Sequence, residues 1–120
     1  MFKKLTDTVS LVENDGASPL LTDEQSALDL IGTAVYVHGC SKLILAKKDI
    51  VEDFFDLRTG MAGAILQKFS NYGVWIAIVG DFKGYTSKNL QDFIYESNKG
   101  RVVYFASSFD EAAAALTKGE

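Results

Sequence analysis

The stretch Val74-Trp-Ile-Ala-Ile-Val79 is apolar at every position and is followed directly by Gly80. A strand that is apolar on both faces is typical of the centre of a parallel sheet, where helices cover both sides. We therefore predict that this stretch is the central strand of an α/β domain. The rest of the chain can be placed by working outward from it.

Further strands are expected on both sides of this central strand. Lys42-Leu-Ile-Leu-Ala46 is a short apolar run between polar residues, which predicts a buried strand. Arg101-Val-Val-Tyr-Phe-Ala106 predicts the last strand, and the loosely alternating residues 5–13 predict an edge strand or a small hairpin.

Helices are expected between these strands and after the last one. Thr22-Asp-Glu-Gln25 has the form of a capping box with Thr22 as the cap, and it predicts a helix over about residues 22–36. The other helices are expected from a start within 53–59 to residue 71, from 86 or 87 to 100, and over 112–116 behind a capping box at 108–111. Since short connections favour right-handed crossovers, the predicted fold is a single α/β domain, residues 1–120, with a mainly parallel sheet of about four to five strands and about four helices.

Composition and charge narrow the class of protein. The chain has 120 residues, of which 48% are hydrophobic and 23% charged, as in an ordinary globular domain. Its net charge is −4 and no run of lysine and arginine occurs, so we expect no nucleic-acid partner. No apolar stretch reaches the roughly 18 residues that cross a bilayer, and Met1-Phe-Lys-Lys-Leu5 is not followed by the apolar core of a signal peptide. A cytoplasmic protein without a membrane partner is expected.

Two loops, Asp53-Phe-Phe-Asp-Leu-Arg-Thr-Gly60 and Gly80-Asp-Phe-Lys-Gly-Tyr-Thr-Ser87, each follow a predicted strand. Because the carboxyl ends of parallel strands meet at one edge of a sheet, where ligands usually bind, we expect both loops at the functional site. The residues predicted to bind a ligand or partner are Phe54, Asp56, Arg58, Thr59, Asp81, Tyr85 and Ser87. Thr86 and Ser87 are also candidate phosphorylation sites.

Helix capping is the alternative role for the polar residues of these loops. Asp53, Asp56 and Ser87 precede predicted helices, where free backbone amides and the helix dipole favour such side chains. Phe54 and Phe55 are adjacent, so we do not expect both to face the core, and one of them is expected to line a pocket or an interface.

Two glycines, Gly60 and Gly63, lie inside the predicted helix that ends at Asn71. Each costs up to about 1 kcal/mol relative to alanine, which indicates that close packing offsets the cost. Packing against the sheet is the preferred interpretation, and packing against a partner is the alternative.

No catalytic residue, metal or cofactor is expected. His38 and Cys40 are near neighbours, but no second histidine or cysteine completes a metal site or a catalytic group. The turn Gly80-Asp-Phe-Lys-Gly84 has neither the dinucleotide-binding pattern of glycines nor a phosphate-binding P-loop.

The family resemblance rests on four segments: residues 52–60, Ile65-Leu-Gln-Lys-Phe69, Ala77-Ile-Val-Gly-Asp-Phe82 and residues 87–101. From about residue 22 onward the chain resembles a small bacterial family catalogued as domain of unknown function 4180, which brings no established activity. The order of elements also resembles, at the level of the fold, the STAS domain of anti-sigma-factor antagonists. That resemblance implies a phosphorylatable hydroxyl at Thr86 or Ser87, although the Asp-Ser-Ser/Thr-Gly-like turn of that group is missing.

Three functions stay open. The preferred hypothesis is a non-catalytic regulatory or protein-interaction module that presents both loops to a protein partner. The second is a small-ligand-binding protein or an enzyme, with Asp56, Arg58, Asp81 and Ser87 around a pocket that takes, for example, a small anionic ligand. The third is a structural module that forms a homodimer through Phe54, Phe55 or Tyr85.

Overall fold

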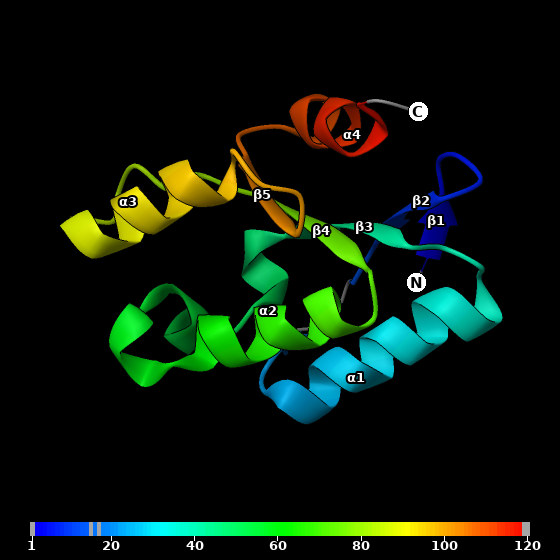
Figure 1. The fold of residues 1–120 in the computed structure, drawn as a ribbon, viewed down its shortest axis with the longest axis horizontal. Coiled ribbons are helices and arrows are strands. Elements are labelled where there is room, and N and C mark those ends of the chain that lie inside the picture. Colours follow the sequence, from blue (N-terminus) through cyan, green and yellow to red (C-terminus); the bar gives the residue numbers. More distant parts are fainter. Residues whose placement is uncertain (1, 15, 17, 119–120) are drawn as a thin grey trace.

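The computed structural model describes residues 2–14, 16 and 18–118 and shows a five-stranded sheet whose strands lie in chain order (Figure 1). The strands are β1 Phe2–Lys4, β2 Val9–Val12, β3 Lys42–Ala46, β4 Trp75–Val79 and β5 Val103–Ala106. β1 pairs antiparallel with β2, and β2 to β5 are parallel. The sheet is therefore mixed, and the prediction of a mainly parallel sheet is corrected, because the chain before β2 folds back as a hairpin.

Helices cover both faces of this sheet. They are α1 Glu24–Gly32, which continues as a π-helical turn Thr33–Val37, then α2 Met61–Asn71, α3 Lys88–Ser97 and α4 Phe109–Thr117. Figure 1 shows α4 on the side of the strands opposite to α1 and α2. When parallel strands lie in chain order, right-handed crossovers place the connecting helices on one face of the sheet. α4 follows the last strand and connects no two strands, so it can cover the other face. Among the described residues, none of these helices combines the length and the apolar character needed to cross a membrane.

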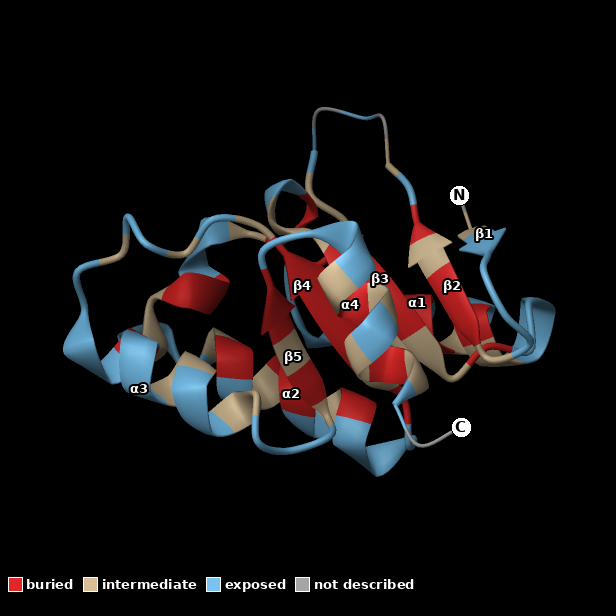
Figure 2. Cartoon of the chain, turned by 90° about the horizontal axis from the view of Figure 1, so that it is seen from above, coloured by how far each residue is buried: buried red, intermediate tan, exposed pale blue. Residues whose placement is uncertain are grey.

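The side chains of β4 alternate between the two faces. Ile76 and Ile78 belong to the large core that includes residues of α1, α2 and α3, whereas Ala77 and Val79 belong to a smaller core under α4. Figure 2 shows the central strands buried along most of their length. The prediction of a central strand covered on both sides is confirmed.

The first helix begins one residue later than the predicted capping box. Asp23, not Thr22, is the cap: its carboxylate accepts a hydrogen bond from the backbone N–H of Ser26 at 2.8 Å, and the Ser26 hydroxyl accepts one from the backbone N–H of Asp23 at 3.0 Å. This register places Ala27, Leu30 and Ile31 in the core, so burial of the apolar stripe decides between two adjacent residues that are both good caps.

The segment before α2 is not helical in the predicted way. Glu52–Phe55 and Leu57–Thr59 form separate short 3₁₀ turns, and α2 begins only at Met61. Gly60 separates the turns from the helix because its φ of +74° lies in the left-handed region that disfavours other residues.

The packing of Gly60 and Gly63 against the sheet, the preferred prediction, is wrong. A Cβ built at either residue meets nothing within 4 Å, so neither glycine is needed for space. Gly60 is needed for its backbone conformation, whereas Gly63 is an exposed residue inside α2 with no such need.

The two glycines should therefore respond oppositely to alanine. Gly60→Ala is expected to lower the free energy of unfolding by about 1–2 kcal/mol, because alanine is strained at positive φ. Gly63→Ala is expected to raise it by about 0.5–1 kcal/mol, because alanine is the better helix former. Urea unfolding of both variants tests this pair, and a loss of stability in Gly63→Ala would contradict the open surroundings of that residue.

The outer edge of β5 is closed by a side chain. The Asn98 amide, just after α3, donates a hydrogen bond to the backbone oxygen of Phe105 at 3.1 Å, and its oxygen accepts one from the Phe105 N–H at 2.7 Å. Asn98 thus makes the two bonds that a neighbouring strand would make at this residue.

Candidate functional site

The loops after β3 and β4 meet at the carboxyl edge of the sheet, as the sequence predicted. The Phe55 ring lies between them, with its centroid 5.5 Å from the stacked ring of Tyr85 and 5.9 Å from that of Phe82. We call residues 47–59 and 80–87 the joined loops. Burial and stacking of these rings hold two segments together that are about thirty residues apart in the chain.

A charged pair covers the ring stack. The Nζ of Lys47 lies 5.0 Å from the Tyr85 ring centroid, 5.2 Å from that of Phe55 and 3.7 Å from a carboxylate oxygen of Glu52. The Tyr85 hydroxyl donates a 2.7 Å hydrogen bond to the other Glu52 oxygen. The pKa of Lys47 is raised, mainly by its hydrogen bond to Tyr85. The pKa of Tyr85 is also raised, mainly by burial.

Gly80 makes room for this arrangement. A Cβ at Gly80 would lie 2.7 Å from the Cβ of Lys47, closer than real contacts of this kind. The absence of a side chain at the end of β4 therefore lets the Lys47 stem lie against the strand and carry its ammonium over the rings.

These shifts predict how stability depends on pH. Both Lys47 and Tyr85 hold their protons more tightly in the folded chain, so their contribution is present below the ordinary pKa values of 10.5 and 10.0 and is lost as the pH rises through the folded values. We expect the free energy of unfolding to fall above about pH 10, and to fall less steeply in Tyr85→Phe.

The matched control for this pH dependence is Tyr36→Phe, which removes a hydroxyl from a side chain that is 83% exposed. Urea unfolding between neutral and alkaline pH measures the effect. An equal alkaline fall in the wild type and in Tyr85→Phe would show that the Tyr85 cluster does not cause it.

The polar residues predicted as ligand contacts are engaged in local structure. Asp56 accepts hydrogen bonds from the backbone N–H of Arg58 at 3.1 Å and from its guanidinium at 2.9 and 3.0 Å. The Thr59 hydroxyl donates to backbone oxygens of the preceding turn, Asp81 accepts from the N–H of Lys83, and Ser87 caps α3. Capping is confirmed for Ser87 at α3, whereas Asp56 caps only the short turn Leu57–Thr59, Asp81 holds a turn that is not at the start of a helix, and α2 has Gly60 at its cap position and no side-chain cap.

Both adjacent phenylalanines are buried, contrary to the sequence prediction. Phe54 is 1% and Phe55 is 3% exposed, and their rings meet edge to face at 5.1 Å. Phe54 enters the large core, while Tyr85 covers Phe55. The expectation that one of them lines an open pocket or interface is wrong, because the second loop supplies the cover.

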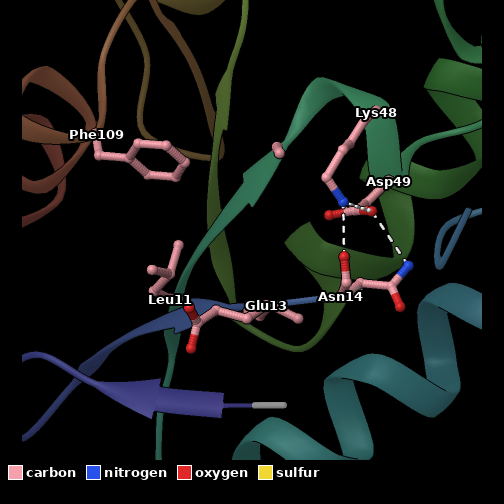
Figure 3. Close-up of a pocket in the computed structure, with 8 residues that line it drawn as sticks. Leu11, Glu13, Asn14, Lys48, Asp49 and Phe109 are labelled. Carbon is pink, nitrogen blue, oxygen red and sulfur yellow. Dashed lines mark hydrogen bonds and ion pairs between the residues drawn. The ribbon is translucent and has the colours of Figure 1, made fainter. Parts of the chain in front are cut away.

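A cleft that sequence reasoning missed lies at the carboxyl ends of β2 and β3, next to the start of α4 (Figure 3). Its volume is about 710 Å³. Leu11 and Phe109 give it an apolar side, and Figure 3 shows Asn14, Lys48 and Asp49 gathered opposite them.

The polar side of the cleft is built around a buried carboxylate. Asp49 is 2% exposed, and one of its oxygens accepts hydrogen bonds from Lys48 Nζ at 2.8 Å and from Asn14 Nδ2 at 3.1 Å. Lys48 Nζ also donates to the backbone oxygen of Asn14 at 2.7 Å. No local sequence pattern indicates that β3 and the start of α4 bring these residues together.

The His38 ring and the Cys40 thiol have different side-chain partners, and the thiol reaches His38 only at its backbone oxygen, at 3.6 Å. The exposed His38 ring stacks on Phe2 at 4.4 Å, whereas the buried Cys40 thiol lies 2.9 Å from the Ser10 hydroxyl. Within residues 2–14, 16 and 18–118, no three His, Cys, Asp or Glu side chains gather to hold a metal ion.

The fold and the site define an α/β domain with a mixed sheet and two loops packed together at its carboxyl edge. The chain belongs to the family described as domain of unknown function (DUF4180), whose sequence pattern matches residues 6–116. No curated protein matches the chain. No solved structure matches it either, so the likeness to STAS domains stays a prediction from the order of elements.

Proposed function

We propose that this protein is a non-catalytic regulatory or protein-interaction module that binds a protein partner through the joined loops. The observation that carries the proposal is the ring stack of Phe55 and Tyr85 under Lys47, which makes one preformed surface from two loops. A preformed surface loses little conformational freedom on binding and therefore favours recognition.

The composition of this surface suits a protein better than a small molecule. Its polar groups are engaged in local structure: Asp56 binds Arg58, Asp81 holds a turn and Ser87 caps α3. Tyr85, Phe82 and Leu57 are half-buried, and the Arg58 side chain, which follows Leu57 in the chain, is 90% exposed. Aromatic residues and arginine surrounded by other polar groups are enriched in protein interfaces.

Phosphorylation at the start of α3 would give this surface a switch. Thr86 is exposed, and Ser87 is the cap whose hydroxyl accepts from the Leu90 N–H at 3.2 Å. A phosphate there adds a charge of about −1.5 to −2 at a helix N-terminus, which favours negative charge, and alters the surface shown to a partner.

The test compares charge reversals on two surfaces. The immobilised protein captures partners from a cell extract, and the captured proteins are quantified for Arg58→Glu/Lys83→Glu and for the matched control Lys3→Glu/Lys4→Glu on β1. We expect the loop variant to lose a captured protein at least about tenfold while the control retains it. Equal capture by both variants would overturn the proposal.

A second variant tests the switch. Ser87→Asp keeps a good helix cap and adds a negative charge at the surface. We expect it to change capture of the same protein, and unchanged capture would remove Ser87 from the proposal. Light scattering of the isolated chain shows whether the partner is a second copy.

A small-ligand-binding function is the second candidate, and the cleft of Figure 3 favours it. An apolar wall with a few polar groups at the carboxyl ends of parallel strands is the usual setting of a ligand site. A ligand in this cleft should raise the melting temperature of the wild type and lose that effect in Phe109→Ala. Binding that is unchanged in Phe109→Ala would place the ligand elsewhere.

A further inference from the structure

A second pocket lies at the opposite edge of the sheet, where β3 and β4 begin. Its volume is about 730 Å³. Lys42 and Trp75, the first residues of these two strands, form part of its wall, and the turn after α3 and the end of α4 complete it. This volume is in the range of small-molecule sites.

The charge of this pocket is opposite to that of the chain. The chain has a net charge of −4, yet the pocket wall contains four cations and one carboxylate. The cations are Lys42, Lys99, Arg101 and Lys118, and the carboxylate is Glu111. One oxygen of the Glu111 carboxylate accepts hydrogen bonds from the Ser107 hydroxyl and N–H at 2.8 and 3.2 Å. Ser107 does not line the pocket, so this oxygen is bound to a residue outside the wall. Lys99 also lies 3.6 Å from a carboxylate oxygen of Glu96, which is not part of the wall, and the wall as a whole still carries a surplus of cations that attracts anions.

An aromatic ring holds two of these cations in place. The Lys42 Nζ lies 5.0 Å from the Trp75 ring centroid and the Arg101 guanidinium carbon lies 5.9 Å from it. Tyr104 adds a second ring to the wall. Cations and rings side by side match a ligand that carries both negative charge and a planar aromatic part, since rings stack on rings and arginine binds phosphate and carboxylate oxygens in a fixed geometry.

We propose that this pocket, which we call the Trp75 pocket, binds a small phosphorylated aromatic molecule. The phosphate lies among Arg101, Lys99 and Lys118, and the planar ring packs against Trp75 and Tyr104. The site is separate from the joined loops, which follow the carboxyl ends of the strands, so it does not depend on the function proposed for them.

The only tryptophan of the chain reports on this pocket directly. The experiment titrates the full chain with adenosine monophosphate, adenosine and inorganic phosphate as probes and records Trp75 fluorescence. We expect a saturable change with the monophosphate at concentrations up to about 1 mM, weaker binding of adenosine and of phosphate, and an affinity that falls as salt is added.

Two double variants test the charges. Lys99→Ala/Arg101→Ala is expected to weaken monophosphate binding at least about tenfold, whereas Lys3→Ala/Lys4→Ala removes the same net charge from the exposed β1 and is expected to change it less than about twofold. Circular dichroism establishes that both variants are folded. The absence of a saturable change, equal binding of adenosine, equal binding of phosphate alone, or equal loss in both variants would each overturn the proposal.

Discussion

Phe55→Ala is expected to lower the free energy of unfolding by about 3–5 kcal/mol, the range for removing a fully buried aromatic ring. The ring is 3% exposed and meets the rings of Phe54, Phe82 and Tyr85 at 5.1, 5.9 and 5.5 Å. These neighbours come from both loops. Removing the ring leaves a cavity that neither loop can fill without moving away from its own strand.

Urea unfolding measures this loss, and Tyr85→Phe is its matched control. The control keeps a stacked ring and removes only the hydroxyl, which hydrogen-bonds to Glu52 and Lys47, so we expect it to cost about 0.5–1.5 kcal/mol. If Phe55→Ala cost no more than Tyr85→Phe, the joined loops would not depend on the ring stack, and the surface proposed for partner binding would lose its basis.

Asn98→Ala is expected to cost about 1–3 kcal/mol and to make the protein associate. The two hydrogen bonds from Asn98 to Phe105 each contribute roughly 0.5–1.5 kcal/mol. Without them the backbone of β5 presents unpaired groups along an open sheet edge, which is a template for pairing with another chain.

Asn71→Ala serves as the matched control for Asn98→Ala. Asn71 is exposed at the end of α2 and accepts one hydrogen bond from Gln67 on the same helix at 2.8 Å, so its loss is expected to cost less than about 0.5 kcal/mol. Urea unfolding gives the stability, and light scattering at increasing protein concentration gives the association. Equal behaviour of the two variants would show that Asn98 does not close the edge.

The strands were the most predictable part of the fold. Two apolar runs, at residues 42–46 and 74–79, predicted β3 and β4 to within one residue because burial on both faces leaves an unbroken apolar pattern. Ser87 was correctly predicted as a helix cap. The sequence pattern alone did not decide which residue caps the first helix, because Thr22 and Asp23 are both good caps. Core packing selected Asp23.

For the candidate site, the sequence predicted that the two loops lie at the same edge of the sheet, but not how they pack together. The rule that parallel strands end at one edge correctly brought the two loops together. It could not show that Tyr85 would cover Phe55, because that contact depends on the path of both loops. The cleft of Figure 3 joins Leu11, Asp49 and Phe109 from distant parts of the chain, and no local pattern indicates that α4 returns across the sheet.

The placement of α4 has a consequence for how the chain folds as it is synthesised. Because β2 to β5 lie in chain order, each new strand adds to the edge of strands already made, and none has to pair with a strand earlier than its immediate predecessor. The face formed by Val9, Ile44 and Ala77 has no cover until residues 109–117 leave the ribosome. The strands can therefore align early, but the smaller of the two cores is shielded from water only when α4 docks.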